Sequence, residues 1–372
     1  MMQLTAKIKL LPIPEQADVL KHTLETANAA CDYISERAWQ EQTFRQFDLH
    51  HLVYYDVRER FGLSAQMTVR CISKVADAYR LDRKTKRSFR QQGAIAYDNR
   101  ILGWKLDKQE VSIWTVDGRQ TIPFACGERQ QELLQSQKGE SDLALIDGAF
   151  YLLATCEVEV AEPIETEKTL GVDLGIVNIA TDSDGKIHSG ARINSIRKRY
   201  AKLRAKLQSK VTKSAKRLLK RRKRKERRFA QDVNHVISKR IVEKAKGTGC
   251  AIALEDLTGI RNRTTVRKSQ RRQHYSWAFY DLRKKIEYKA QLVGIPVILV
   301  DPKNTSRTCP ICGCVDKRNR PNQSTFSCVQ CGFSDHADTI AAVNIGRRAV
   351  VNPPNVSTEV LKDNIVVNCN TV

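Results

Sequence analysis

Residues 169–175 read TLGVDLG and place one carboxylate, Asp173, at the end of a short apolar strand with glycines beside it. A second carboxylate, Glu255, follows the apolar strand 250–254, and a third, Asp338, precedes small and apolar residues at helical spacing. Hydrolysis of a phosphodiester at a two-metal site needs carboxylates held on rigid elements. The three acids therefore suggest a Mg²⁺ site at one end of a sheet.

Each acid also has a plainer interpretation. Asp173 could end a strand in a turn, Asp338 could cap a helix, and Glu255 could pair with a nearby arginine. Asp256 competes with Glu255 for the second position, and Asp335 competes with Asp338 for the third. Spacing alone leaves these choices open.

The elements around Asp173 indicate an α/β layer architecture. After residue 168 the pattern predicts strand, hairpin, long helix, strand, helix and strand, which is the alternation of a sheet covered by helices. The hairpin turns at Ser183-Asp184-Gly185, and the later elements are a helix over 277–292 and a strand over 295–300.

The first 160 residues have a different pattern. A half-buried strand opens the chain, and helices dominate from 14 to 85, with Pro14 starting one and another beginning near Ser64. Between 94 and 160, Asp117-Gly118 and Asp147-Gly148 predict the turns of two hairpins. We expect an antiparallel sheet or small barrel with a helical insertion, followed by a linker over 161–168.

Four of the eleven cysteines form two Cys-x-x-Cys pairs separated by fifteen residues. This spacing is typical of a zinc site whose four thiolates are Cys309, Cys312, Cys328 and Cys331. Four sulfur ligands leave no open coordination position, so the Zn²⁺ is expected to be structural. The other seven cysteines, Cys314 included, are scattered and are expected to be reduced thiols.

The charge of the chain predicts a large anionic partner. The net charge is +23, and eighteen Lys or Arg but only one acid, Glu226, lie between Arg197 and Arg228. Basic side chains release condensed counterions when they neutralise phosphates, so we expect nucleic acid bound mainly through its backbone. A solvated basic face is the alternative interpretation of the run. No apolar stretch of about 18 residues occurs and the N-terminus has no secretory pattern, so we expect a cytoplasmic protein without membrane contact.

Four strings occur in order along the chain: GVDLGIVNIATDSDG, ALEDLTGIR, WAFYDLRKKIEYKAQLVGIPVILVDPKNTSRTCPICG and CGFSDHADTIAAVNI. Together they closely resemble TnpB, the OrfB-type protein of insertion sequences, which is related to the type V CRISPR nucleases. The resemblance covers 168–350 and continues more faintly through KIKLLPIPEQ and LSAQMTVRCISKVADAY. Its motifs assign the catalytic acids to Asp173, Glu255 and Asp338.

The resemblance implies a multidomain α/β fold: an N-terminal antiparallel β-barrel (wedge) with a helical insertion, then an RNase H-like RuvC domain with an inserted zinc ribbon. The expected boundaries are a wedge barrel (1–13 and 86–165), a helical recognition insertion (14–85), a RuvC nuclease domain (168–304 and 336–350), a zinc ribbon (305–335) and a disordered tail (351–372).

The resemblance also implies a function: an RNA-guided, Mg²⁺-dependent DNA endonuclease of a transposable element. Its partners would be a guide RNA from the transposon end and target double-stranded DNA carrying a short flanking motif. An RNA-guided DNA-binding repressor without cleavage and a strand-transferring transposase are the alternatives.

Two features depart from this pattern or extend it. The family motif usually reads Asp-x-Asn-Ala-Ala, whereas this chain has Asp338-Thr-Ile340-Ala-Ala, so Ile340 puts fine positioning of the third acid in doubt. Residues 261–275 are rich in Arg, Gln and Thr, and are interpreted either as a mobile lid over the site or as a solvated loop.

Overall fold

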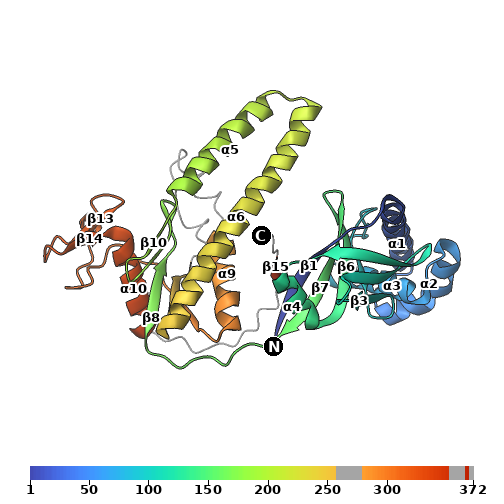
Figure 1. The fold of residues 1–372 in the computed structure, drawn as a ribbon, viewed down its shortest axis with the longest axis horizontal. Coiled ribbons are helices and arrows are strands. Elements are labelled where there is room, and N and C mark those ends of the chain that lie inside the picture. The colour runs from blue at the N-terminus through green and yellow to red at the C-terminus, as the bar shows by residue number, and fades with distance from the viewer. Residues whose placement is uncertain (257–278, 352–364, 368–372) are drawn as a thin grey trace. The chain divides into compact units, whose positions relative to one another are not determined.

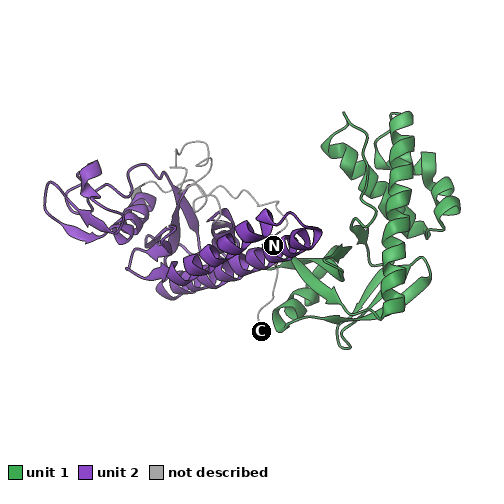
Figure 2. Cartoon of the chain, turned by 90° about the horizontal axis from the view of Figure 1, so that it is seen from above, with its two compact units in different colours: residues 1–159, 361–372 green, residues 160–360 purple. Residues whose placement is uncertain are grey.

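The computed structural model describes residues 1–256, 279–351 and 365–367. The chain divides into two compact units, Met1–Glu159 with Leu361–Val372, and Val160–Val360 (Figure 2). The lid interpretation of residues 261–275 falls outside the described residues. No helix of the described part is long and apolar enough to cross a membrane.

The first unit is built on a nearly closed antiparallel barrel sheet. Its strands are ordered β2-β6-β7-β1-β5-β4-β3. Their bounds are β1 Met2–Leu10, β2 Ile95–Tyr97, β3 Leu102–Lys105, β4 Glu110–Thr115, β5 Gly118–Ala125, β6 Gln137–Ile146 and β7 Ala149–Val158. Both predicted hairpins are confirmed: β4 pairs with β5 and β6 with β7. Asp147 and Gly148 both have positive φ, at 59° and 83°, as a two-residue hairpin turn requires.

Helices fill the interval between β1 and β2, as the sequence predicts. They are α1 Pro14–Gln40, α2 Gln46–Phe61 and α3 Ala65–Leu81, and a fourth, α4 Glu128–Gln135, follows β5. The hydroxyl of Ser64 accepts a hydrogen bond from the Met67 amide at 3.3 Å and caps α3. Helix α2 falls within the range where helices are predicted, but its own bounds cannot be predicted, because exposed aromatic residues interrupt its buried positions.

The second unit contains a five-stranded mixed sheet ordered β10-β9-β8-β11-β12, with β8, β11 and β12 parallel (Figure 1). The strands are β8 Thr169–Asp173, β9 Asn178–Asp182, β10 Ile187–Ser189, β11 Ala251–Glu255 and β12 Val297–Val300. The helices are α5 Ala191–Ser209, α6 Lys213–Thr248, α9 Phe279–Leu292 and α10 Ala337–Val351. A small lobe between β12 and α10 holds η1 Lys317–Asn319, β13 Thr325–Ser327 and β14 Ser334–His336.

Helices cover both faces of this sheet. Val172 and Leu254 belong to the core that β8 and β11 form with α6 and α9. Ala253 packs instead with Ile345 of α10. Because side chains alternate between the faces of a strand, Asp173 lies on the side of the sheet that α10 covers, and Glu255 does so too.

Helices α5 and α6 form the hairpin that carries the basic run (Figure 1). Arg204 of α5 pairs with Glu226 of α6 at 2.9 Å, and the rings of Tyr200 and Phe229 meet edge to face at 6.5 Å. The single acid of the run is therefore used to join the two helices.

Two observations concern the ends of the first unit. The first unit ends at Glu159 rather than 165, because Ile164 donates its amide to the Gly294 carbonyl at 2.9 Å and so joins the second unit. In the tail, Ile365–Val367 forms strand β15, parallel to Leu4–Ala6 of β1. The other tail residues, 352–364 and 368–372, lie outside the described part.

Candidate functional site

Three carboxylates converge on the α10 side of the mixed sheet. Val172 pairs with Leu254 in the β8–β11 register, so Asp173 and Glu255 end neighbouring parallel strands. Asp338 lies in the first turn of α10, the helix that packs on β8. The structure thus brings together the three acids singled out in the sequence.

The close packing of α10 on β8 depends on Gly171. A Cβ at this position would overlap the carbonyl oxygen of Ala342 and crowd the amide of Gly346. Thr169 of β8 also joins the strand to α10, because its hydroxyl donates a hydrogen bond to the Gly346 carbonyl at 2.9 Å. Small residues on both elements therefore bring the backbone of α10, and Asp338 with it, next to the end of β8.

Asp338 and Glu255 each accept hydrogen bonds from side chains of other segments. Asn178 of β9 donates to Oδ2 of Asp338 at 2.9 Å, while Arg320 of the small lobe donates to Oδ1 at 3.0 Å. Thr305 donates its hydroxyl to Oε1 of Glu255 at 2.5 Å. These donors come from three different segments, so the carboxylates are oriented by the fold around them.

A buried asparagine fixes the Thr305 segment. Asn344 of α10 donates to the carbonyls of Thr305 and Thr308, both at 2.8 Å. Asn344 and Thr305 are both buried. The helix that supplies Asp338 therefore also positions the hydroxyl that bonds Glu255.

The electrostatics of the cluster disfavour three negative charges. Burial, together with the neighbouring charges of Glu255 and Asp338, raises the pKa of Asp173 to about 8, while the charge of Arg320 opposes this shift. Burial also raises the pKa of Glu255, against the hydrogen bond from Thr305. Such a site is short of positive charge and is suited to divalent cations with oxygen ligands.

The competing acids lie elsewhere. Asp256 accepts a hydrogen bond from Arg283 of α9 at 2.9 Å. Asp335 is exposed on β14, and its carboxylate bonds the amide of its neighbour His336. The geometry therefore favours Glu255 and Asp338 over their neighbours.

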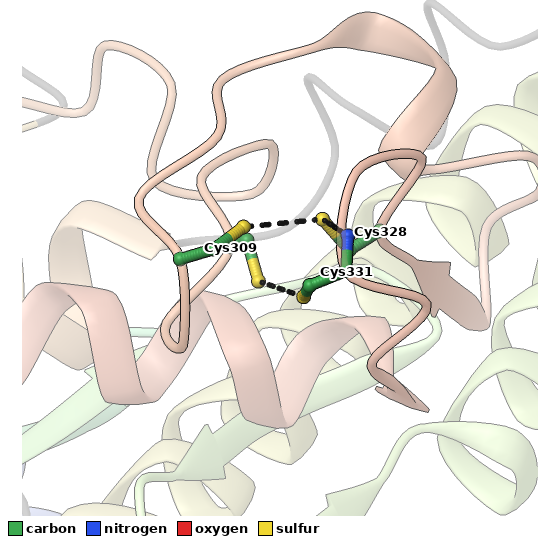
Figure 3. Close-up of side chains that lie close together, drawn as sticks. Cys309, Cys328 and Cys331 are labelled. Atoms are coloured by element: carbon green, nitrogen blue, oxygen red, sulfur yellow. Dashed lines mark hydrogen bonds between the residues drawn. The ribbon is translucent and has the colours of Figure 1, made fainter.

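The four cysteines of the two Cys-x-x-Cys pairs meet in the small lobe (Figure 3). Their sulfur atoms all lie within 4.8 Å of one another. The amides of Cys331 and Gln330 donate to the sulfur of Cys328 and lower the pKa of this thiol to about 6. The neighbouring thiols raise the pKa of Cys312 instead, to about 12. The four thiols together could hold a metal ion.

Glycines make the turn that follows each Cys-x-x-Cys pair. Gly313 and Gly332 have φ of 73° and 74°, and each donates its amide to the carbonyl of the first cysteine in its pair. Only glycine adopts this backbone region without strain.

Ile340 lies in the core of the same lobe. Its side chain is 2% exposed and packs in a cluster with Cys309, Phe326 and Cys328. The apolar side chain at this position therefore closes the core under the cysteine cluster.

Sequence reasoning missed the residues that surround the acids. Arg320, Thr305 and Asn178 each bond one of the three carboxylates, yet they lie 18, 50 and 160 residues from their partners. No periodicity or short motif connects residues so far apart. Asn178 and Thr305 do fall inside the strings that carry the resemblance, which is the one signal available for them.

Comparison with known proteins agrees with these features. Residues 154–274 match the family described as a probable transposase (OrfB_IS605), and residues 279–345 match the family described as the Cas12f1-like TNB domain. A TnpB-like protein of Methanocaldococcus jannaschii is 31% identical over 203 residues, which are 51% of this chain and 72% of that protein. The chain belongs to the TnpB family.

Relatives outside TnpB match a smaller part of their own length. A CRISPR-associated endodeoxyribonuclease Cas12f1 of Sulfoacidibacillus thermotolerans is 41% identical over 135 residues, 36% of this chain and 30% of that protein. This member of the TnpB family therefore spans less than a third of that relative.

The fold has a solved counterpart. A Cas12f1 chain from a complex with single guide RNA and target DNA superimposes with a TM-score of 0.59, at 14% identity, over 90% of this chain and 83% of that chain. At this identity the likeness concerns the fold.

Proposed function

We propose that this TnpB-family chain is an RNA-guided DNA endonuclease that hydrolyses phosphodiester bonds at Asp173, Glu255 and Asp338. The observation that carries the proposal is the convergence of these carboxylates from β8, β11 and α10 on one face of the sheet. In domain terms, residues 168–304 and 336–350 would be an RuvC-type nuclease domain and residues 305–335 an inserted zinc ribbon. The relatives named RNA-guided or CRISPR-associated nucleases support the same activity.

The three acids fit Mg²⁺, which prefers carboxylate oxygens and leaves room for water and phosphate oxygens. Two such ions supply an activated water and stabilise the leaving oxygen of a phosphodiester. The raised pKa of Asp173 supports this fit, because three adjacent carboxylates are costly without cations.

The surrounding residues have distinct tasks. Arg320 and Asn178 hold the two oxygens of Asp338, and Thr305 holds one oxygen of Glu255. With its donors fixed, each carboxylate keeps the orientation that a reacting phosphodiester requires. Asp173 is the last residue of strand β8, and its carboxylate accepts a hydrogen bond from the backbone of Leu174.

The cysteine cluster would hold one structural Zn²⁺. Zinc bound by four thiolates supplies folding energy rather than chemistry. Arg320 belongs to this lobe, and Ile340 of α10 packs in the core of the lobe. Folding of the lobe would therefore position both the Arg320 donor to Asp338 and the start of α10.

The basic hairpin α5–α6 supports a nucleic-acid partner. Eighteen Lys or Arg lie between Arg197 and Arg228, and Arg204 uses the only acid of this run. The remaining cations suit the phosphates of a guide RNA, its target strand, or both.

Purification of the chain from cells that carry its native locus, followed by sequencing of the bound RNA, tests the guided part of the proposal. We expect one discrete RNA from the transposon end whose terminal segment directs cleavage of matching DNA. If no discrete RNA is recovered, the guided mechanism is wrong, whereas the acidic site stays testable by mutation.

A further inference from the structure

A groove lies between the edge strand β10 and the sheet-proximal half of α6, two strands away from Asp173 in the sheet order. It has a volume of about 370 Å³, within the range of small-ligand pockets, which begins near about 300 Å³. We call it the β10–α6 groove. Its lining includes apolar side chains (Ile187, Ile193 and Val236) and cationic or titratable ones (Lys186, His188 and Arg240).

The apolar part of the lining is open to solvent. Ile187 and Val236 are 39% and 41% exposed, on opposite sides of the groove. An apolar surface between β10 and α6 would accept a flat ring more readily than a charged group.

The rim carries positive charge that no described acid neutralises. Neither Lys186 nor Arg240 has an ion-pair partner within residues 1–256, 279–351 and 365–367. Lys244, one turn beyond Arg240, contrasts with them, because it binds Asp182 at 2.6 Å and Asp184 at 2.8 Å. Asp182 and Asp184 are thus already engaged by another lysine.

Two further residues of the lining bear on this charge. Burial and then the charge of Arg240 lower the pKa of His188. Asp232, the one acid in the lining, is exposed and opposes only part of the positive charge of Lys186 and Arg240. A ligand with an apolar ring and a negative group would therefore match the groove: the ring would contact Ile187 and Val236, and the negative group would lie near Lys186 and Arg240.

The groove is also continuous with the basic run. Arg228 ends that run and Arg240 lines the groove on the same helix, about 18 Å further along α6 at 1.5 Å per residue. A strand whose phosphates follow α6 therefore reaches the groove without leaving the helix.

We propose that the β10–α6 groove binds one unpaired nucleotide of a single-stranded nucleic-acid segment, with the base on Ile187 and Val236 and the phosphates at Lys186 and Arg240. This inference rests on the proposed function, because it takes nucleic acid as the partner. A protein strand added to the edge of β10 fits less well. That strand has three residues and an irregular register between His188 and Ser189.

The test measures binding of labelled oligouridylate and oligothymidylate to the full chain by fluorescence anisotropy over a series of salt concentrations. The groove variant is Lys186→Ala with Arg240→Ala. The matched control is Lys239→Ala with Lys246→Ala, which removes two exposed charges of α6 outside the groove. We expect about tenfold weaker binding for the groove variant, with the salt slope lower by about 0.7 for each lost phosphate contact, and a smaller effect for the control.

A second measurement locates the strand. Oligouridylate carrying 4-thiouridine should photocross-link to peptides of β10 and of α6 near Val236. If both double variants weaken binding equally, or the cross-links fall elsewhere, the groove is not the site, although the chain still binds nucleic acid. If the wild-type chain binds neither oligonucleotide, the nucleic-acid function fails as well.

Discussion

Gly171 of β8 lies against Ala342 of α10 so closely that a Cβ at position 171 would overlap the Ala342 carbonyl oxygen. Two residues after this glycine comes Asp173, and one turn before Ala342 comes Asp338. The contact therefore sets the separation between the first and third acids. Replacing the glycine tests whether the site depends on this spacing.

Gly171→Ala should lower the free energy of unfolding by about 1–3 kcal/mol, because the helix must move away from the sheet. Cleavage should fall with it, since Asp338 moves with α10. The control is Gly247→Ala in α6, where an added Cβ meets nothing within 4 Å. This control should be stabilising by about 0.5–1 kcal/mol. Thermal unfolding and cleavage assays measure both, and an active, fully stable Gly171→Ala protein would contradict the packing argument.

Arg320→Ala should slow cleavage by about tenfold to a hundredfold while leaving the fold intact, because Asp338 loses the donor to its Oδ1 atom. Arg320→Lys should recover part of the rate. Arg318→Ala is the matched control, since the exposed Arg318 pairs with Asp316 and contacts none of the three acids. Equal rates for the Arg318 and Arg320 variants in a cleavage time course would remove Arg320 from the site.

The Asp173 carboxyl should make the metal-free protein less stable as pH rises. Its folded pKa of about 8 lies above the usual value near about 3.9, so the stability it contributes is present at low pH and is lost as pH rises through about 8. Asp173→Asn should therefore melt higher than the wild type in the presence of chelator, by a margin that grows between those pH values. Each kcal/mol corresponds to about 2–4 °C.

Added Mg²⁺ provides the complementary readout for the same pair of proteins. It should raise the melting temperature of the wild type and have little effect on Asp173→Asn, because a ligand that binds only the folded state stabilises it. The contrary result is a difference in melting temperature between the two proteins that does not change with pH, together with equal responses to Mg²⁺. It would mean that the pKa of Asp173 is not raised and that Asp173 is not a metal ligand.

Ile340→Asn should destabilise the lobe that holds the four cysteines. The side chain is 2% exposed among Cys309, Phe326 and Cys328, so an asparagine there buries an amide without a partner. We expect earlier release of zinc on titration with a chelator, measured with a metallochromic dye. Ile340→Val is the control and should cost about 0.5–1.5 kcal/mol. Unchanged zinc retention in Ile340→Asn would show that the position tolerates the family's usual polar residue.

Much of the candidate site could be read from the sequence, because its strongest signals are local. The alternation of β8 and β11 places Asp173 and Glu255 at strand ends, and the Cys-x-x-Cys spacing identifies the thiols. The choice of Asp338 over Asp335 needed the family motif, since both acids lie near the start of α10. The structure separates them by exposure and by the donors around Asp338.

The remainder depends on contacts between distant segments. Arg320 reaches Asp338 only when the small lobe has folded, and Asn344 supports Thr305 only when α10 is packed on the sheet. The β10–α6 groove is likewise created by residues far apart in the chain, since Val236 comes 49 residues after Ile187. Nothing in the local pattern of either segment indicates that they meet.

The most direct test of the central claim is cleavage of a DNA that matches the RNA bound to the purified chain, assayed in Mg²⁺ for the wild type, Asp173→Ala and Asp335→Ala. Asp335 is the control because it is an exposed acid three residues from Asp338. The account predicts cut DNA for the wild type and Asp335→Ala, and intact DNA for Asp173→Ala and for every sample with chelator. Cleavage by Asp173→Ala at the wild-type rate would contradict it.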